Sequence, residues 1–357
     1  VDALAFLSGV SPYEHAGCAV ASAGDLDSDG FADVLIGADN RSDLVSYGGV
    51  VYLVHGPVTG AISLSSAEAT VLGDVAWDSL GRSLEGGFDV TGDGVLDIVA
   101  STARTGEFFV ISGDLVSGTS MLSDVGMAVG TSAQELSVGG DLNADGLADI
   151  AVQTSGVRLL YGPVSPSAWG DVIISSGGLG NFGDALSILG DLDGDGTDDL
   201  AVGSPSDDSS ATDAGAVYLF QGPYSASLSS VDAVAVLTGE SAADDAGRSV
   251  ALAEDLNGDG LGDVIVGAPQ NDTSAVNAGA SYLFFGPITG TFSLASADVR
   301  LGGEEGFAYA GDQVRADTDV DLDGRADLLI SAPNMDAPGG GGGADHGATY
   351  LFLGLRF

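Results

Sequence analysis

Six short segments of the sequence carry oxygen-bearing side chains at alternating positions, a pattern that suits the binding of a hard divalent cation. Each follows Asp-x-(Asp/Asn/Thr)-x-Asp-Gly-x-x-Asp over nine residues. Such a cation takes six to eight oxygen ligands, and alternate positions of a short loop can present them on one side. Positions 1, 3, 5 and 9 offer side-chain oxygens and position 7 a backbone carbonyl. The glycine at position 6 allows a sharp turn.

The spacing therefore predicts one set of metal ligands per segment. The sets are Asp25, Asp27, Asp29, Phe31 and Asp33; Asp89, Thr91, Asp93, Val95 and Asp97; Asp141, Asn143, Asp145, Leu147 and Asp149; Asp191, Asp193, Asp195, Thr197 and Asp199; Asp255, Asn257, Asp259, Leu261 and Asp263; and Asp319, Asp321, Asp323, Arg325 and Asp327. We expect up to six Ca²⁺ ions in a structural role, because Mg²⁺ prefers to keep its waters. The second set, with Thr91, is expected to be the weakest. The sixth departs from the pattern with Leu322 at position 4, where the others have Gly, Ala or Ser.

Two other interpretations of these segments are weaker. An EF-hand loop would have Glu at position 12 and flanking helices, whereas the residues that flank these segments are strand-like. Asp and Gly also favour ordinary turns. A turn, however, has no reason to keep three alternating carboxylates that repel one another, in six segments that share one register.

The aspartate segments belong to a longer repeat, which predicts the elements that position them. The segments start at intervals of 64, 52, 50, 64 and 64 residues, and a Gly lies eight residues before each start except in the third repeat, which has Ala133 there. An apolar run with a Gly-Ala-Pro-like end follows each segment. Two further apolar stretches come next, the first usually closed by Gly-Pro. Four short strands in a repeat of this length are typical of a β-propeller blade.

We therefore predict an all-β fold, a six-bladed β-propeller of four-stranded antiparallel blades in a single domain over residues 1–357. The 38 residues after Asp319 and the 24 before Asp25 together make 62, which is one repeat. The N-terminal ALAFLSG is similar to VAVLTG, the fourth strand of the fifth repeat. We thus expect Ala3–Leu7, within residues 1–10, to form the outer strand of the sixth blade. Seven blades, the alternative, would need about another 60 residues, one blade period.

The composition excludes several classes of function. Nine Arg and no Lys stand against 52 acidic residues, which gives a net charge of −43. This negative charge would repel nucleic acids and anionic membranes, and nine Arg cannot form the basic patch that binds them. Without lysine, the chain cannot catalyse through a lysine Schiff base. An apolar content of 45% argues against disorder. The apolar runs are strand-sized, so we expect no membrane insertion. We expect a monomer.

The order of these features resembles the FG-GAP repeats of integrin α-subunit propellers and of their bacterial relatives. The resemblance is clearest in FGDALSILGDLDGDGTDDLAVGSP (Phe182–Pro205) and AGRSVALAEDLNGDGLGDVIVGAP (Ala246–Pro269). It covers essentially the whole chain and is weaker in the second and third repeats. Two features depart from the family: integrin heads have seven blades, and the Phe of the Phe-Gly pair is present only as Phe182.

The resemblance implies a rigid platform that binds other molecules, with calcium as a brace. It places the aspartate loops between the first and second strands of each blade, on one face, and the loops between the second and third strands on the opposite face. The latter are long in the first, fourth, fifth and sixth repeats. We hypothesise that Asn40–Tyr47, Asp207–Asp213, Gln270–Asn277 and Asn334–His346 form one recognition surface. The alternative is that loop length drifts freely on a surface.

The sequence thus favours a non-catalytic, secreted or cell-surface adhesion module that binds a protein or glycan on the face opposite the calcium loops. Calcium sites of extracellular modules have Kd values of roughly 10⁻⁴–10⁻³ M, which suits a setting with millimolar calcium. Two alternatives are a propeller hydrolase or lyase with a carboxylate site at the channel mouth, and a structural spacer without a ligand. The enzyme predicts clustered, pKa-shifted carboxylates in a concave pocket.

Overall fold

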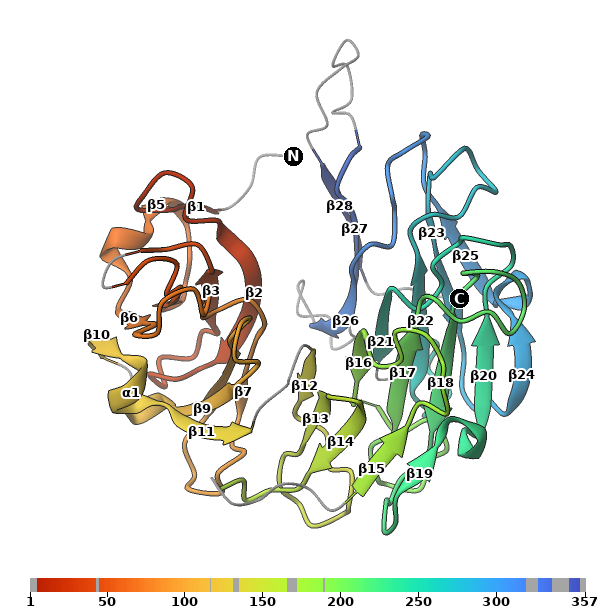
Figure 1. Cartoon of the computed structure of the whole chain (residues 1–357), viewed down its shortest axis with the longest axis horizontal. Helices are drawn as coiled ribbons and strands as arrows, with labels where there is room; N and C mark the ends of the chain where they lie inside the picture. Colours follow the sequence, from red (N-terminus) through yellow and green to blue (C-terminus); the bar gives the residue numbers. More distant parts are fainter. Residues whose placement is uncertain are drawn as a thin grey trace. The chain divides into compact units, whose positions relative to one another are not determined.

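The structure is a computed structural model that describes residues 5–42, 45–115, 117–130, 135–165, 172–188, 190–253, 255–318, 327–335 and 347–353 (Figure 1). The chain divides into two compact units. The first unit comprises Val1–Gly139, Leu147–Thr154 and Leu160–Gly170. The second comprises Gly140–Gly146, Ser155–Leu159 and Asp171–Phe357. The prediction of a single domain stays a prediction.

In the described part of the chain, each of the six repeats has its own sheet, and a further sheet has two strands. In the first unit, the first repeat contains β2 (Ala16–Gly24), β3 (Asp33–Ala38), β4 (Val50–Val54) and β6 (Ala69–Leu72). The second repeat contains β7 (Leu84–Phe88), β8 (Asp97–Ser101), β9 (Phe108–Ser112) and β11 (Met127–Gly130). The first unit also holds β12 (Leu136–Val138) and β13 (Ile150–Gln153) of the third repeat. The second unit holds the rest of the third repeat, namely β14 (Gly156–Leu160, all but its last residue) and β15 (Val172–Ser175), and the fourth repeat, with β16 (Ala185–Ser187), β17 (Leu200–Ser204), β18 (Ala216–Phe220) and β20 (Ala235–Thr238). The fifth repeat follows in the same unit with β21 (Ser249–Ala253), β22 (Asp263–Ala268), β23 (Ala280–Phe284) and β25 (Val299–Gly302). The sixth repeat contributes β26 (Val314–Thr318), β27 (Asp327–Ala332) and β28 (Ala348–Phe352).

Apolar residues on both faces of the middle strands explain why the sheets stack on one another. The strands β4, β17, β18 and β23 are buried along their whole length. One apolar core cluster joins residues of the first and second sheets, from Leu35 and Val51 to Ile98 and Ile111. Similar clusters join the fourth sheet to the fifth and the fifth to the sixth. The structure confirms the predicted all-β fold, a six-bladed β-propeller. In the described part of the chain, α1 (Leu122–Val125) is the one α-helix, and no helix is long and apolar enough to cross a membrane.

Two glycines of the repeat are explained by backbone conformation and close packing. The glycine eight residues before the aspartate loop has a left-handed φ of 81–97° at Gly17, Gly81, Gly183, Gly247 and Gly311, a region that side chains with a Cβ disfavour. A second glycine lies near the end of the second strand. It packs on the carbonyl of the left-handed glycine of the next repeat. A Cβ at Gly37, Gly203 or Gly267 would lie 2.0–2.1 Å from the oxygen of Gly81, Gly247 or Gly311.

Four short parallel pairings, which the sequence did not predict, link successive repeats at their outer strands. The strands β10 (Gly118–Met121), β19 (Leu228–Ser229) and β24 (Gly290–Ser293) each pair with the outer strand of the preceding repeat, β6, β15 and β20. The equivalent strand of the first repeat, β5 (Gly60–Ser63), pairs in the same way with β1 (Ala5–Ser8). Thus β1 has the pairing of a preceding repeat's outer strand.

The closure of the sixth blade by this N-terminal segment stays a prediction. The described part of the sixth sheet contains three strands, β26, β27 and β28. Of the predicted outer strand Ala3–Leu7, residues 3 and 4 lie outside the described residues.

Candidate metal centres and the opposite ends of the blades

The aspartate loops lie between the first and second strands of their repeats, as the family resemblance implied. The loops at 25–33, 89–97, 191–199 and 255–263 join β2 to β3, β7 to β8, β16 to β17 and β21 to β22, and the loop at 141–149 lies between β12 and β13. Of the sixth loop, Asp319, Asp321, Asp323 and Arg325 lie outside the described residues, whereas Asp327 is described and buried.

The aspartate at position 1 holds each described loop in its turn. One carboxylate oxygen of Asp25 accepts the backbone N–H of Asp29 (3.0 Å), and the other accepts that of Gly30 (2.9 Å). Asp89, Asp141, Asp191 and Asp255 accept the same two N–H groups in their loops. The shared bonds explain why one sequence pattern gives one loop geometry.

Two loops gather three carboxylates. In Asp25, Asp27 and Asp29, and again in Asp191, Asp193 and Asp195, one oxygen of each side chain lies within 4.8 Å of the others. Two unit charges about 4 Å apart in water repel by about 1 kcal/mol. The groups are therefore suited to a cation. In the other described loops, position 3 is Thr91, Asn143 or Asn257 and offers a neutral oxygen.

The aspartate at position 9 is buried and bonds to the backbone. One oxygen of Asp199 accepts the N–H of Leu192 (2.7 Å), and the other accepts that of Gly222 (2.9 Å). Asp33 and Asp263 make the same two bonds, and Asp149 makes the second. A structural task for this residue is thus evident, and its role as a metal ligand stays a prediction.

The second loop differs at this position, and its third strand is followed by Gly-Asp where the first, third, fourth and fifth repeats have Gly-Pro. Gly113 donates its N–H to the carbonyl of Leu96, not to Asp97. Among the described residues, Asp97 Oδ1 and the buried hydroxyl of Thr91 have no hydrogen-bond partner. Two buried oxygens in one loop are thus available to a further donor or to a cation. The expectation that this loop binds calcium least well stays a prediction.

Burial also affects the protonation of these carboxyl groups. It raises the pKa of Asp199 to about 7 and that of Asp263 to about 6, since the backbone hydrogen bonds offset only part of the desolvation and neighbouring loop aspartates add to the rise. Burial likewise raises the pKa of Asp97. Each raised pKa means that burial disfavours the charged carboxylate. A bound cation would favour that charged form.

Two further residues of these loop regions were not singled out as site residues from the sequence. The carboxylate of Asp198 accepts the N–H of Asp141 (2.8 Å) and that of Gly190 (3.0 Å), so it ties the third loop to the fourth. The second Asp in DGTDD was the available signal. His55 Nδ1 lies 3.1 Å from Asp27 Oδ2, beside the first carboxylate group.

At the opposite ends of the blades, three long loops are held by one set of backbone bonds, which we call the loop frame. In the first repeat, Trp77, Ser79 and Leu80 donate their N–H groups to the carbonyls of Ser46, Tyr47 and Gly48. The same three bonds join 243–246 to 212–214 and 307–310 to 276–278. Of the three residues whose carbonyls accept these bonds, the middle one has a left-handed φ in each loop: Tyr47, Asp213 and Asn277.

The first repeat fills its loop frame with two exposed aromatic residues. Trp77 is 58% exposed, and its ring stacks on that of Tyr47 with centroids 4.5 Å apart and planes at 22°. Asp213 and Ala243 stand in their places in the fourth repeat. Trp77 is one of three exposed aromatics with left-handed φ that lie four residues before the repeat glycine, with Tyr13 and Phe307. This spacing was the sequence signal that could have identified them.

The proposed recognition loops are only partly described. Residues 43, 44 and 336–346, which include His346, lie outside the described residues. The loops Asp207–Asp213 and Gln270–Asn277 follow β17 and β22 in the second unit. A single recognition surface made of all four loops stays a prediction.

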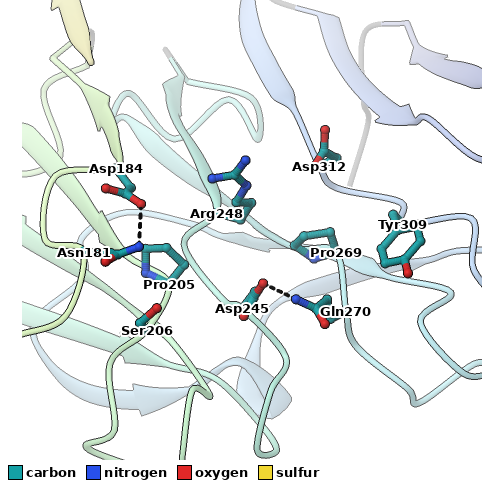
Figure 2. Close-up of a pocket in the computed structure, with 10 residues that line it drawn as sticks. All are labelled: Asn181, Asp184, Pro205, Ser206, Asp245, Arg248, Pro269, Gln270, Tyr309 and Asp312. Atoms are coloured by element: carbon teal, nitrogen blue, oxygen red, sulfur yellow. Dashed lines mark hydrogen bonds between the residues drawn. The ribbon is translucent and has the colours of Figure 1, made fainter. Parts of the chain in front are cut away.

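A pocket of about 330 Å³ opens beside these loops in the second unit (Figure 2). It is lined by Asn181, Asp184, Pro205, Ser206, Asp245, Arg248, Pro269, Gln270, Tyr309 and Asp312. Burial raises the pKa of Asp245, while the hydrogen bond from Gln270 and the charge of Arg248 oppose the rise. A carboxylate with a raised pKa in a concave pocket is a feature that the enzyme alternative predicts, so Asp245 does not count against that alternative.

Comparison with known families bears on the repeats directly. Residues 19–54, 182–220 and 246–284 match the FG-GAP repeat. Each match begins within the first strand of a sheet or three residues before it, includes the aspartate loop and ends with the third strand. The chain contains FG-GAP repeats. The three matched repeats are the first, fourth and fifth; the matched ranges do not include the sixth, where the sequence resemblance was also specific.

Curated relatives are integrin α subunits, each similar to a part of this chain. Integrin alpha-PS5 of Drosophila melanogaster is 37% identical over 120 residues, 33% of this chain and 11% of the relative. Human integrin alpha-IIb is 34% identical over 123 residues, with the same shares. Integrin alpha pat-2 of Caenorhabditis elegans is 37% identical over 97 residues, 27% of this chain and 8% of the relative. The matches thus span about a tenth of the relatives' length.

Solved structures show a weaker likeness. BBS1N, in the crystal structure of its complex with ARL6DN soaked with mercury, aligns with 84% of this chain and 70% of that chain. The sequence identity is 10% and the TM-score is 0.46.

Proposed function

We propose that this chain is a calcium-stabilised, non-catalytic binding module that recognises a protein or glycan through the ends of its blades opposite the aspartate loops. The FG-GAP repeats and the homology to integrin α subunits support an adhesion or binding role. Calcium, the extracellular or cell-surface setting and the class of ligand are parts of the proposal.

The aspartate loops supply the proposed calcium sites. The residues at positions 1, 3 and 5 would hold each ion, with the carbonyl at position 7 and, where a lone pair is free, the aspartate at position 9. The ion would supply positive charge where Asp25, Asp27 and Asp29 bring three carboxylates together. The unpartnered oxygens of Thr91 and Asp97 fit the same role. Sites of this class bind Ca²⁺ with Kd values of roughly 10⁻⁴–10⁻³ M, which supports a setting with millimolar calcium.

The observation that carries the recognition role is the aromatic pair Tyr47–Trp77. A left-handed backbone is unfavourable by roughly 1–2 kcal/mol for most residues with a Cβ, and among these Asp and Asn tolerate it best. The fourth repeat keeps the loop frame with Asp213 and Ala243, so the frame does not need aromatic side chains. Exposed aromatic residues that the fold does not require are typical anchors of binding surfaces.

The test transfers the residues of the fourth repeat to the first. The double variant Tyr47→Asp, Trp77→Ala and the wild type are applied in Ca²⁺ to arrays of glycans and of extracellular matrix proteins. We expect the wild type to bind a defined subset and the double variant to lose most of that binding. Phe31→Ala is the matched control, since Phe31 is an exposed aromatic residue of an aspartate loop in the same unit.

Three results would count against the proposal. If the double variant binds as the wild type does, the aromatic pair is not the anchor. If Phe31→Ala loses the same binding, the aspartate-loop ends are the binding surface. If the wild type binds nothing on either array, the module is better described as a spacer.

A further inference from the structure

The pocket in the second unit is built from equivalent positions of three successive repeats. Asn181, Asp245 and Tyr309 lie two residues before the repeat glycine, and Asp184, Arg248 and Asp312 lie one residue after it. Pro205 and Pro269, which follow the second strands β17 and β22, complete the walls. The pocket is therefore a feature of the repeat architecture, with side chains that differ from one repeat to the next.

The backbone around the pocket is fixed. Asn181, Asp245 and Tyr309 all have a left-handed φ, of 57°, 54° and 54°. Each accepts, through its carbonyl, the N–H of the residue three positions later: Asp184 (3.2 Å), Arg248 (3.1 Å) and Asp312 (3.2 Å). Three identical turns thus direct three charged side chains to one pocket, and little ordering is left for a ligand to impose.

Two of the three carboxylates are held by amide groups. Asn181 Nδ2 donates to Asp184 Oδ2 (2.9 Å), and Gln270 Nε2 donates to Asp245 Oδ2 (Figure 2). These bonds satisfy carboxylates that would otherwise be the natural partners of the nearby guanidinium.

The Arg248 guanidinium and the Asp312 carboxylate keep their bonding capacity. Among the described residues, neither group makes a hydrogen bond, and neither forms an ion pair within 4.0 Å. Arg41, by contrast, is bonded to Glu14 at 2.8 Å. In the view of Figure 2, Arg248 lies between Asp184 and Asp312. A guanidinium offers five donors in a planar fork that matches a carboxylate, and a carboxylate accepts from an ammonium group.

We propose that this pocket binds a free α-amino acid, whose carboxylate bonds to Arg248 and whose ammonium group bonds to Asp312. A simple cation would meet the guanidinium, and a simple anion would meet the surrounding carboxylates. A molecule that carries a carboxylate and an ammonium group on one carbon offers a partner to each of the two groups. The volume of about 330 Å³ equals about ten water molecules, which accommodates an amino acid with a small or medium side chain. Tyr309, Pro205 and Pro269 offer apolar surface to that side chain.

The experiment is isothermal titration of the full chain, with Ca²⁺ present, with L-alanine and L-leucine as probes. Propionate and ethylamine each carry one of the two charges, and N-acetyl-alanine amide carries neither. We expect saturable binding of an amino acid, and binding at least about tenfold weaker for propionate and ethylamine, because each lacks one charge-assisted hydrogen bond. We expect no binding of the capped amide.

Variants assign the two charges. Arg248→Gln and Asp312→Asn should each weaken amino-acid binding by about tenfold or more. Arg82→Gln is the matched control: Arg82 is exposed and holds the equivalent position of the second repeat, outside the pocket lining. The Arg82→Gln variant should bind the amino acid as tightly as the wild type does.

The proposal fails if none of the amino acids binds, if propionate or ethylamine binds as well as L-alanine, or if Arg248→Gln or Asp312→Asn binds like the wild type. A thermal melt shows whether each variant is folded. Because Tyr47 and Trp77 belong to the first unit and line no part of this pocket, the array experiment and this titration can fail independently.

Discussion

The two ends of each blade differ in how far the repeats have diverged. At the aspartate-loop end, the described repeats keep the same bonds from the loop backbone to the aspartate at position 1. At the other end, the loop frame recurs in three repeats, but its side chains range from Tyr47 and Trp77 to Asp213 and Ala243. The contrast indicates that one end maintains the fold and the other is free to specialise.

The largest expected effect is that of calcium on the uniform end. At a Ca²⁺ concentration ten times Kd, each site adds about 1.4 kcal/mol to the free energy of unfolding, so six sites would add roughly 8 kcal/mol. We expect a markedly higher melting temperature in millimolar Ca²⁺ than in excess EGTA, with a smaller effect of Mg²⁺. Equal melting temperatures in Ca²⁺ and EGTA would show that the loops act as ordinary turns.

Removal of a single carboxylate should separate two roles within one loop. Asp199→Ala leaves the buried N–H of Leu192 and the half-buried N–H of Gly222 without acceptors, at about 1–3 kcal/mol each. We expect a loss of about 3 kcal/mol in the free energy of unfolding, measured by urea denaturation in EGTA. The exposed Asp193, changed to Ala under the same conditions, should cost less than about 1 kcal/mol. Equal losses would contradict a structural role specific to position 9.

The raised pKa values predict how calcium-free protein responds to pH. In the folded state the pKa of Asp199 is about 7 and that of Asp263 about 6, against 3.8 for an unperturbed Asp. The folded state thus holds protons that the unfolded state has released, so these groups stabilise the fold below about pH 4 and lose that contribution as pH rises to about 7. In EGTA we expect the melting temperature to fall over this range. In Ca²⁺ the fall should shrink, and an equal fall in both would mean that no cation interacts with these carboxylates.

The sequence predicted the uniform end far better than the variable one. Spacing located the aspartate loops and the strands on both sides, because Gly and Asp at fixed positions are demanded by backbone geometry, as the φ of Gly247 illustrates. The bonds of Asp199 were missed, since a carboxylate that accepts buried N–H groups looks the same in sequence as a metal ligand. The spacing of Trp77 and Arg248 from the repeat glycine marks their positions. The stack of Tyr47 on Trp77 and the pocket around Arg248, however, depend on contacts between residues distant in the chain, which that spacing does not reveal.

The smallest expected effect concerns stability at the variable end. In the double variant Tyr47→Asp, Trp77→Ala, a stacked aromatic pair contributing about 0.5–1.5 kcal/mol is lost. A less strained left-handed residue is gained at position 47, and Ala243 shows that Ala is accommodated in the equivalent of position 77. We therefore expect the free energy of unfolding in Ca²⁺ to change by less than about 1 kcal/mol, as measured by urea denaturation. A large loss would mean that the aromatic pair is part of the scaffold, and the division of labour between the two ends would then not hold in the first repeat.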